Sequence, residues 1–299
     1  MSSERTPRVC IVTRPTPYEL LRREHGTAGQ AAFFLRSRGQ DVAVTAKADA
    51  GFHGVLEEVW AAVPPSWRRA EVHRADLDRF LFAPDDVVVC VGQDGLVANV
   101  AKYLDGQIVV GINPDPSRYD GVLARHSSAD ARGLIESAGL GRPAVEERTL
   151  VECTLDDGQT LRALNEIFLG HRGHQSARYT ISWRGSAERH SSSGVICGTG
   201  TGATGWCRSI ARERRDAPEP PGPTEPALVF FVREAFPSVS TQTALTAGVL
   251  EPGEALTVVS EMDNDGVIFG DGIEEDRLAF GYGVVATVRA SAARLRLAI

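Results

Sequence analysis

The 299-residue chain lacks the features that mark membrane and nucleic-acid-binding proteins. No apolar run approaches the roughly 20 residues that a membrane helix needs, so we expect no membrane partner. Basic residues number 32 against 39 acidic ones, and the net charge of −7 argues against a general nucleic-acid surface. Local basic pockets for a phosphorylated ligand remain compatible with this balance.

Cysteine is scarce, and the spacing of the cysteines argues against a zinc knuckle. The five cysteines are widely spaced, and no pair has the spacing of a zinc knuckle. Cys10, Cys90 and Cys197 lie in apolar runs that are typical of strands, where reduced thiols fill core positions. The polar start of the chain shows neither a secretory signal nor an Arg/Ser-rich presequence. We therefore predict a cytoplasmic protein with reduced thiols.

The first part of the chain, residues 1–125, alternates strand and helix patterns. Strands are predicted at residues 8–13, 41–45, 87–91 and 107–112, and helices at 18–38, 52–62 and 96–104, with a break near Gly26. Such alternation predicts βαβ units and a parallel, Rossmann-like sheet.

The remainder, residues 126–299, carries a different pattern. A helix at 128–137 is followed by short strands at 147–155, 160–169, 178–184, 194–197, 227–232, 255–261 and 278–289. Asp157-Gly158 is a good hairpin turn, and residues 218–226 form a proline-rich loop. The pattern predicts a mostly-β, sandwich-like second domain, with the extreme C-terminus free to pack back on the first domain.

The most informative stretch is residues 87–96. A β-branched run, VVVCV, predicts a buried parallel strand, and it ends in Gly92-Gln93-Asp94-Gly95 before a helix. Ligands of open α/β sheets bind at the carboxyl ends of strands, where helix N-terminal amides attract phosphate. Asp94 is thus a candidate for phosphoryl chemistry. The alternative is an ordinary Asp-Gly turn that caps a helix.

Two polar residues interrupt an apolar strand at Asn165-Glu166. Neighbouring side chains of a strand point to opposite faces, so at least one of them should face the core or a cleft. Burying an unpaired carboxylate costs several kcal/mol. Either Glu166 pairs with an arginine at a sheet edge, or both residues hold ligand hydroxyl or amino groups.

A glycine-rich segment, SGVICGTGTGATGW, occupies residues 193–206. Glycine at every second or third position lets the backbone approach a ligand, threonines offer hydroxyl groups, and Trp206 offers a flat stacking surface. The segment is neither a Walker P-loop nor a GxGxxG fingerprint. We interpret it as a ligand-binding loop.

Weaker candidates surround these three motifs. His171 and His174 have a spacing compatible with a metal, but loop histidines are usually solvated. The other candidates are Arg208, Arg212, Arg214 and Arg215 after the glycine-rich segment, Asn113 to Asp115 and Arg118 after a strand, and the turn Asp271-Gly272.

Taken in order, the motifs resemble those of the NAD kinase family. That family has a strand leading into GGDGT, a Gly-Ile/Val-Asn strand end, an Asn-Glu pair, a TPTGSTAY-like loop and a late Asp-Gly. This chain has Gly92 to Leu96, Gly111-Ile112-Asn113, Asn165-Glu166, Thr199 to Trp206, and Asp271-Gly272. GINPDPSRYDGVL, LNEIFLG and VFFVRE look most like the mitochondrial-type branch.

The resemblance implies a kinase that moves phosphate from ATP to the adenosine ribose 2′-hydroxyl of NAD. Asp94 would be the catalytic residue, and Mg²⁺ would come with the nucleotide rather than sit in a protein cage. No protein metal site is implied. Residues 1–125 would be a nucleotide-binding domain and residues 126–299 an NAD-binding domain. Partners would be small nucleotides, and the chain would form a dimer or tetramer. Nucleotide-binding residues would be Gly92, Gln93, Gly95, Asn113, Asn165, Glu166, Thr199, Gly200, Thr201, Gly202, Thr204 and Trp206.

Two residues depart from the family pattern, and they keep alternatives open. Gln93 stands in place of the second glycine of GGDGT, and Leu96 in place of its threonine. A side chain at 93 would hinder phosphates or require a backbone conformation that favours glycine. One alternative is therefore a family member that binds NAD or NADP without transferring phosphate. Another is a kinase of a different small hydroxylated metabolite.

Overall fold

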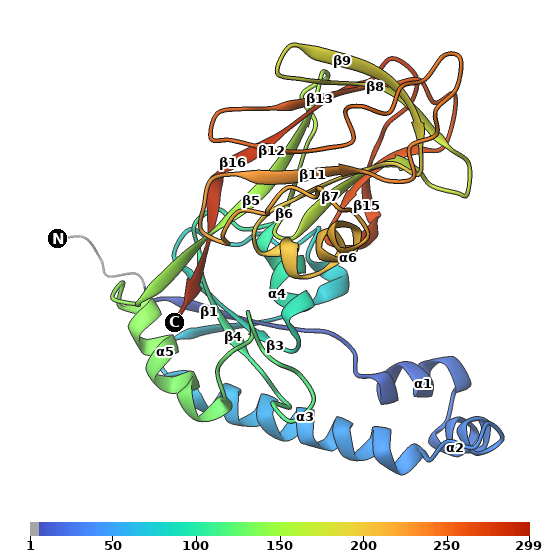
Figure 1. Cartoon of the computed structure of the whole chain (residues 1–299). Helices are drawn as coiled ribbons and strands as arrows, with labels where there is room; N and C mark the ends of the chain where they lie inside the picture. The colour runs from blue at the N-terminus through green and yellow to red at the C-terminus, as the bar shows by residue number, and fades with distance from the viewer. Residues whose placement is uncertain (1–5) are drawn as a thin grey trace. The chain divides into compact units, whose positions relative to one another are not determined.

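The computed structural model describes residues 6–299; the polar start at residues 1–5 lies outside the described residues. The chain divides into two compact units (Figure 1). Unit 1 is formed by the chain up to Tyr103, by Gln107–Val145 and by Arg296–Ile299, and unit 2 by Leu104–Gly106 and Glu146–Leu295. The sequence-based boundary after residue 125 differs from this division.

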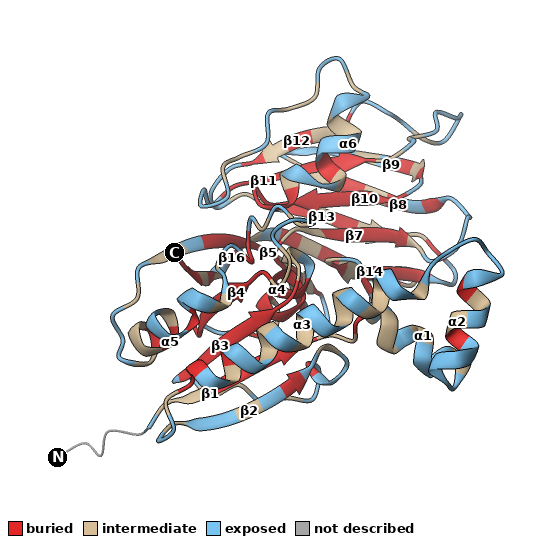
Figure 2. Ribbon diagram, turned by 90° about the horizontal axis from the view of Figure 1, so that it is seen from below, coloured by how far each residue is buried: buried red, intermediate tan, exposed pale blue. Residues whose placement is uncertain are grey.

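Unit 1 contains the predicted parallel sheet. Its strand order is β2-β1-β3-β4, all parallel. The strands are β1 (Arg8–Thr13), β2 (Arg68–His73), β3 (Asp86–Val91) and β4 (Ile108–Ile112). Every residue of β3 and β4 is buried, as Figure 2 shows for both strands, which is the expected state of β-branched runs in a covered sheet. The α/β class predicted for this region is confirmed.

Helices complete unit 1. They are α1 (Pro17–His25), α2 (Ala28–Arg36), α3 (Val42–Ala62), α4 (Asp94–Ala101) and α5 (Ala131–Gly139). The predicted break near Gly26 is present, with Gly26 at φ 76° between α1 and α2. Val59 of α3 and Ile135 of α5 share one core cluster with the strands. This packing keeps α5 in unit 1 although it follows residue 125.

One strand prediction in unit 1 is wrong, and one strand was missed. Residues 42–45 are the first residues of α3, because the side chain of the N-cap residue Asp41 accepts the Ala43 N–H at 2.9 Å and caps an alanine-rich helix. The missed strand is β2, RRAEVH, an edge strand with mostly exposed residues. Its charged residues suit an edge but hide the apolar alternation from sequence analysis.

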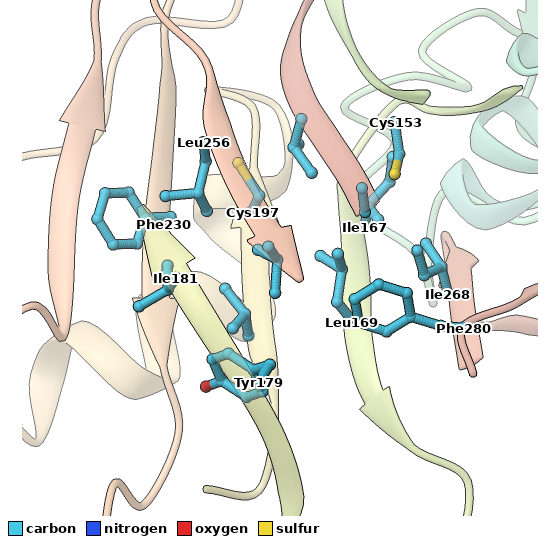
Figure 3. Close-up of a cluster of buried hydrophobic side chains, with 14 of the residues drawn as sticks. Cys153, Ile167, Leu169, Tyr179, Ile181, Cys197, Phe230, Leu256, Ile268 and Phe280 are labelled. Carbon is cyan, nitrogen blue, oxygen red and sulfur yellow. The ribbon is translucent and has the colours of Figure 1, made fainter. Parts of the chain in front are cut away.

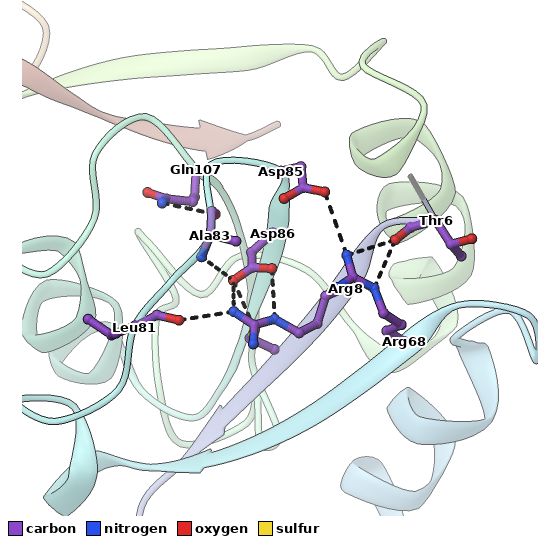
Figure 4. A network of polar contacts seen from close by, with 9 residues as sticks. Thr6, Arg8, Arg68, Leu81, Ala83, Asp85, Asp86 and Gln107 are labelled. Carbon is purple, nitrogen blue, oxygen red and sulfur yellow. Dashed lines mark hydrogen bonds and ion pairs between the residues drawn. The ribbon is translucent and has the colours of Figure 1, made fainter. Parts of the chain in front are cut away.

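An ion pair fixes the amino edge of this sheet (Figure 4). The Arg8 guanidinium donates to both carboxylate oxygens of Asp86, at 2.8 and 2.5 Å, and Asp86 is buried. Arg8 and Asp86 are also register partners of β1 and β3. A bidentate contact of this kind orients two parallel strands and leaves neither charge unpaired.

Unit 2 is built from antiparallel strands in two sheets. One contains β9 (Ser186–Ser192), β8 (Ala177–Trp183), β13 (Leu256–Ser260) and β16 (Val285–Ala298), with β5 (Val145–Leu155) on β16 and β6 (Thr160–Ala163) on β5. The other has the order β12 (Ala247–Leu250), β11 (Leu228–Val232), β10 (Val195–Gly198), β7 (Glu166–His171), β14 (Gly266–Gly270) and β15 (Ile273–Ala279).

A single apolar cluster joins these sheets, as in a sandwich (Figure 3). Tyr179 and Leu256 come from the first sheet, and Ile167, Cys197 and Phe230 from the second. The predicted mostly-β, sandwich-like class is therefore confirmed. The cysteine prediction also holds, because Cys10, Cys90, Cys153, Cys197 and Cys207 are all buried and free.

Several strand boundaries differ from the sequence prediction. The predicted strand at 160–169 is interrupted at Leu164-Asn165, and that at 278–289 belongs to two strands, β15 and β16. The strands β9, β12 and β14 were missed because they are short, polar or glycine-containing. The Asp157-Gly158 turn is confirmed, with Gly158 at φ 89°. Among residues 6–299, no helix has both the length and the apolar composition needed to cross a bilayer.

Candidate functional site

In unit 1 the turn after β3 leads directly into α4. Gln93 is the residue before the first turn of α4, with φ −80° and ψ 165°, a conformation open to any residue. The expectation that this position favours a glycine backbone is therefore wrong. Gly95 is exposed, and a Cβ atom added there would meet no atom within 4 Å outside its own turn of α4. The turn thus leaves open space beside its second glycine.

Leu96 has a packing role in this turn. Its side chain is fully buried, and its Cδ2 atom lies 3.0 Å from where a Cβ atom at Gly92 would stand. A larger residue at position 92 would therefore crowd the Leu96 side chain. The Leu96 side chain belongs to the core of unit 1 and does not face a ligand.

Asp94 is held by three backbone amides. Oδ1 accepts the N–H groups of Leu123 and Ala124 at 2.9 and 2.8 Å, and Oδ2 accepts that of Val122 at 2.9 Å. A carboxylate has about four acceptor positions, so one position on Oδ2 remains. Asp94 therefore anchors the loop after β4 and keeps a single position for a proton or a ligand.

Asn113 is also committed to this loop. Its Nδ2 donates to the Tyr119 carbonyl at 2.9 Å, and its Oδ1 accepts the Asp115 N–H at 3.0 Å. Gly121, at φ 67°, would place a Cβ atom 2.8 Å from Asn113 Nδ2 and 2.5 Å from the Ala124 carbonyl oxygen. Asn113 thus shapes the loop that holds Asp94, which is a less direct role than the nucleotide contact that the sequence suggests.

In unit 2 a second aspartate holds a row of amides. Asp271, at φ 52° in the hairpin turn between β14 and β15, accepts the N–H groups of Leu164 and Asn165 at 2.8 and 2.7 Å. The Glu166 N–H lies 3.4 Å from the same carboxylate. The turn predicted at Asp271-Gly272 is present, and it positions the Asn165-Glu166 pair.

The glycine-rich segment packs against that pair. The Thr199 hydroxyl donates to the Leu164 carbonyl at 2.5 Å and accepts the N–H groups of Thr201 and Gly202 at 3.1 and 3.2 Å. A Cβ atom at Gly202 would stand 2.1 Å from the Asn165 carbonyl oxygen. At Gly200 it would stand 2.2 Å from the Gly222 carbonyl oxygen. These two glycines therefore permit close packing of the chain on itself, whereas the sequence had indicated space for a ligand.

Glu166 is the carboxyl group with an unusual environment. It is half-buried at the start of β7, and burial, with the charge of Asp271, raises the pKa of Glu166 to about 7. A carboxyl that titrates near neutrality can accept or release a proton at working pH. The alternative of an arginine partner at a sheet edge finds no support, since no ion pair joins Glu166 to an arginine among the described residues.

Trp206 and Thr204 follow on the surface of unit 2. The Trp206 ring is stacked on Phe168, with ring centroids 5.9 Å apart, and Arg233 lies 5.1 Å from its centre. Thr204 is exposed and donates to the Thr201 carbonyl at 3.2 Å. Beside them lies an open hollow of about 300 Å³, lined by Ala203, Cys207, Arg208, Ala211, Arg212, Pro220 and Phe231. Two arginines in the hollow provide positive charge for an anionic ligand.

The remaining sequence candidates have other placements. Arg214 donates to the Val232 and Thr246 carbonyls and so fastens the strands beneath α6 (Trp206–Arg212). His171 is the last residue of β7; its Nδ1 accepts the Gly173 N–H at 2.9 Å, and its Nε2 is buried with no hydrogen-bond partner among the described residues, so the expectation of a solvated loop histidine does not hold for it. A mixed cluster that sequence analysis missed is formed by Glu19, Asp49 and His53, with His53 Nε2 3.3 Å from Glu19. These contacts join polar side chains on the surfaces of α1 and α3.

The predicted residues therefore gather in two clusters. In unit 1, Gly92, Gln93, Asp94 and Gly95 lie at the carboxyl edge of the parallel sheet, with Asn113 in the adjoining loop. In unit 2, Asn165, Glu166 and Thr199 to Gly202 form one hydrogen-bonded group with Asp271. Sequence analysis missed Arg14, which follows β1 and whose Nη2 donates to Gln93 Oε1 at 2.6 Å. Its only sequence signal is its position just after a strand.

Solved structures of two kinases share the fold of this chain. Yeast NADH kinase, complexed with NADH, matches with a TM-score of 0.57 and 15% identity, over 98% of this chain and 83% of that chain. An NAD kinase from Archaeoglobus fulgidus, in complex with ATP, matches with a TM-score of 0.57 and 17% identity, over 98% of this chain and 93% of that chain. No protein-family model and no curated protein sequence matches the chain.

Proposed function

We propose that the protein transfers a phosphoryl group from ATP to the adenosine ribose 2′-hydroxyl of NAD, giving NADP. The observation that carries this proposal is the fold shared with the NADH kinase and the NAD kinase over 98% of the chain. The motifs at Asp94 and Asn165-Glu166 add support because both are partly exposed, and at the end of the glycine-rich segment Thr204 is exposed and Trp206 half-buried.

In the proposed reaction the ribose 2′-oxygen forms a bond to the γ-phosphorus, and the bond from that phosphorus to the β–γ bridging oxygen breaks. ADP leaves, and the hydroxyl proton passes to the remaining acceptor position on Asp94 Oδ2. The amides of Val122, Leu123 and Ala124 hold this carboxylate in place. Asp94 would then act with its orientation already set.

The acceptor nucleotide would bind through unit 2. Asn165 and Glu166 are half-buried at the start of β7 and would hold nucleoside hydroxyl or amino groups. Arg208 and Arg212 in the neighbouring hollow would meet its phosphates. Mg²⁺ belongs to the donor substrate in this scheme, since the Asp94 carboxylate is largely engaged by amides and forms no ready cage for a resident ion.

The direct test is incubation of the purified chain with NAD, ATP and Mg²⁺, followed by chromatographic separation of NADP. We expect NADP to accumulate in proportion to protein and time. Other triphosphates and polyphosphate should be tried as donors. Complete absence of NADP with every donor would refute the proposal.

A nucleotide-binding protein without transfer is the second candidate. Two residues favour it. Leu96 is a buried core residue at the position where the NAD kinase motif GGDGT has the threonine hydroxyl, and Gln93 has a side chain where that motif has a glycine. Calorimetry would then detect NAD or NADP binding while no donor yields a product. A third outcome, phosphate transfer to another hydroxylated metabolite but not to NAD, would be seen in an ATP-consumption assay over a metabolite panel.

A further inference from the structure

An arginine and a glutamine meet at the carboxyl edge of the parallel sheet in unit 1. Arg14 is the first residue after β1, and Gln93 is the second after β3. The two strands are parallel neighbours, with Val12 opposite Cys90, so their ends lie side by side. Arg14 Nη2 donates to Gln93 Oε1 at 2.6 Å, and both side chains belong to half-buried residues.

The partner of Arg14 orients its charge without neutralising it. An amide oxygen is neutral, and the contact uses one of the five N–H donors of the guanidinium. Among residues 6–299, no ion pair joins Arg14 to a carboxylate. Arg8, at the other end of β1, shows the contrast, since both of its contacts to Asp86 are with a carboxylate (Figure 4).

We infer that Gln93 is a positioning residue that holds Arg14 ready to bind the phosphates of the phosphoryl donor. This inference rests on the proposed function. Arginine binds phosphate through paired N–H donors, and it does so best when the guanidinium is already oriented. Gly95, where a Cβ atom would meet nothing within 4 Å, leaves space on the same turn for the ligand. At this position a glycine would let phosphate approach the backbone, whereas Gln93 instead holds the Arg14 guanidinium in place for the phosphate.

The test measures binding of inorganic tripolyphosphate and of ATP to the full chain by calorimetry. Arg14→Gln should weaken both affinities about 10- to 100-fold, the range that charge-assisted hydrogen bonds support. Gln93→Glu keeps the shape and the contact but adds a carboxylate, so it should neutralise Arg14 and weaken binding in the same direction. In Arg14→Ala, added guanidinium ion should restore part of the ATP affinity, which a merely structural role would not produce.

Matched control variants make the same two changes, loss of an arginine charge and gain of a carboxylate, at other positions of unit 1. Arg23→Gln and Gln40→Glu alter exposed residues of the chain and should leave both affinities within about twofold. Thermal melts establish that every variant is folded. Wild-type protein that binds no tripolyphosphate, or Arg14→Gln that binds it as tightly as wild type, overturns the inference. Unchanged affinity in Gln93→Glu overturns the positioning role.

These outcomes separate the inference from the proposed function. If the wild type makes no NADP but its tripolyphosphate binding depends on Arg14, the function fails and the inference stands. If the wild type makes NADP and Arg14→Gln has an unchanged KM for ATP, the inference fails and the function stands.

Discussion

At the scale of single residues, two aspartates use the same device in different units. Asp94 accepts the N–H groups of three consecutive residues, 122–124, and Asp271 accepts those of Leu164 and Asn165 with Glu166 close by. A carboxylate that accepts several backbone N–H groups fixes a loop because each bond is charge-assisted. Asp94 therefore fixes the loop after β4, and Asp271 fixes the Asn165-Glu166 pair.

This arrangement makes Asp94→Asn a structural as well as a chemical change. The asparagine amide nitrogen is a donor, and it would face at least one of the backbone N–H groups that Asp94 now accepts. We expect the free energy of unfolding to fall by about 1–3 kcal/mol, together with loss of any NADP formation. Urea titration and the NADP assay measure the two effects.

The control for this variant is Asp78→Asn, at an exposed position of the same unit. It should change the unfolding free energy by less than about 0.5 kcal/mol. Equal stability of Asp94→Asn and wild type would contradict the anchoring role.

Glu166 predicts a pH dependence of stability. The carboxyl has an ordinary pKa of 4.5, which burial and Asp271 raise to about 7 in the folded chain. Between these values the folded state keeps a proton that the unfolded state has released, so stability falls as pH rises through this window. Glu166→Gln removes the titration. Its stability relative to wild type should increase from about pH 4.5 to pH 7 and stay level above that.

Denaturant titrations at several pH values measure this difference. Glu219→Gln, at an exposed position of unit 2, is the matched control and should show no such trend. A stability difference between Glu166→Gln and wild type that is constant with pH would argue against a raised pKa at this site.

At the scale of elements, the end of β10 and the segment after it depend on close backbone contacts. Gly198 would place a Cβ atom 2.6 Å from Cys207 Sγ, and Gly202 would place one 2.1 Å from the Asn165 carbonyl oxygen. Thr199 adds hydrogen bonds that tie the segment to Leu164. The segment is therefore a packed element of unit 2 rather than a flexible loop.

Gly202→Ala tests this packing. The added methyl group meets backbone, which cannot move aside as a side chain can, so we expect a loss of about 1–3 kcal/mol of stability. Gly281→Ala is the control, because a Cβ atom there meets nothing within 4 Å. Thermal or urea unfolding of the two variants gives the comparison. A Gly202→Ala protein as stable as Gly281→Ala would show that the backbone around Gly202 moves to accommodate the methyl group, which would contradict the close packing.

At the scale of the whole molecule, each unit has its own core. Unit 1 is built on the cluster that contains Val9, Val89 and Ile135, and unit 2 on the one that contains Ile167, Tyr179 and Phe230. The fold of this chain is that of the NADH kinase and NAD kinase structures over 98% of its length. Because the fold alone is shared at 15–17% identity, activity has to be measured on this protein.

Assembly is the prediction that belongs to this scale. The resemblance to NAD kinases implies a dimer or tetramer, so light scattering should give a mass at least twice the 32.1 kDa of one chain. The measurement should be repeated over a range of protein concentrations. A mass of one chain at micromolar concentration would contradict the prediction.

The sequence by itself determined the fold class and the identity of the candidate motifs. Residues 87–91 predict a buried parallel strand because a β-branched run is apolar on both faces, and β3 is such a strand. The hairpin turns at Asp157-Gly158 and Asp271-Gly272 are equally local, since turn residues set their own backbone angles. Patterns of this kind depend only on neighbours in the chain.

Only the tertiary structure decided what the motif residues contact. The amides that hold Asp94 lie 28 to 30 residues away, Asp271 reaches Asn165 across 106 residues, and Arg14 reaches Gln93 across 79. Edge strand β2 and the helical start at Asp41 were likewise settled by packing and capping rather than by pattern. These hydrogen bonds join turns and loops at the ends of strands, so they depend on which strands become neighbours in the sheet, and a motif taken alone does not show its distant partner.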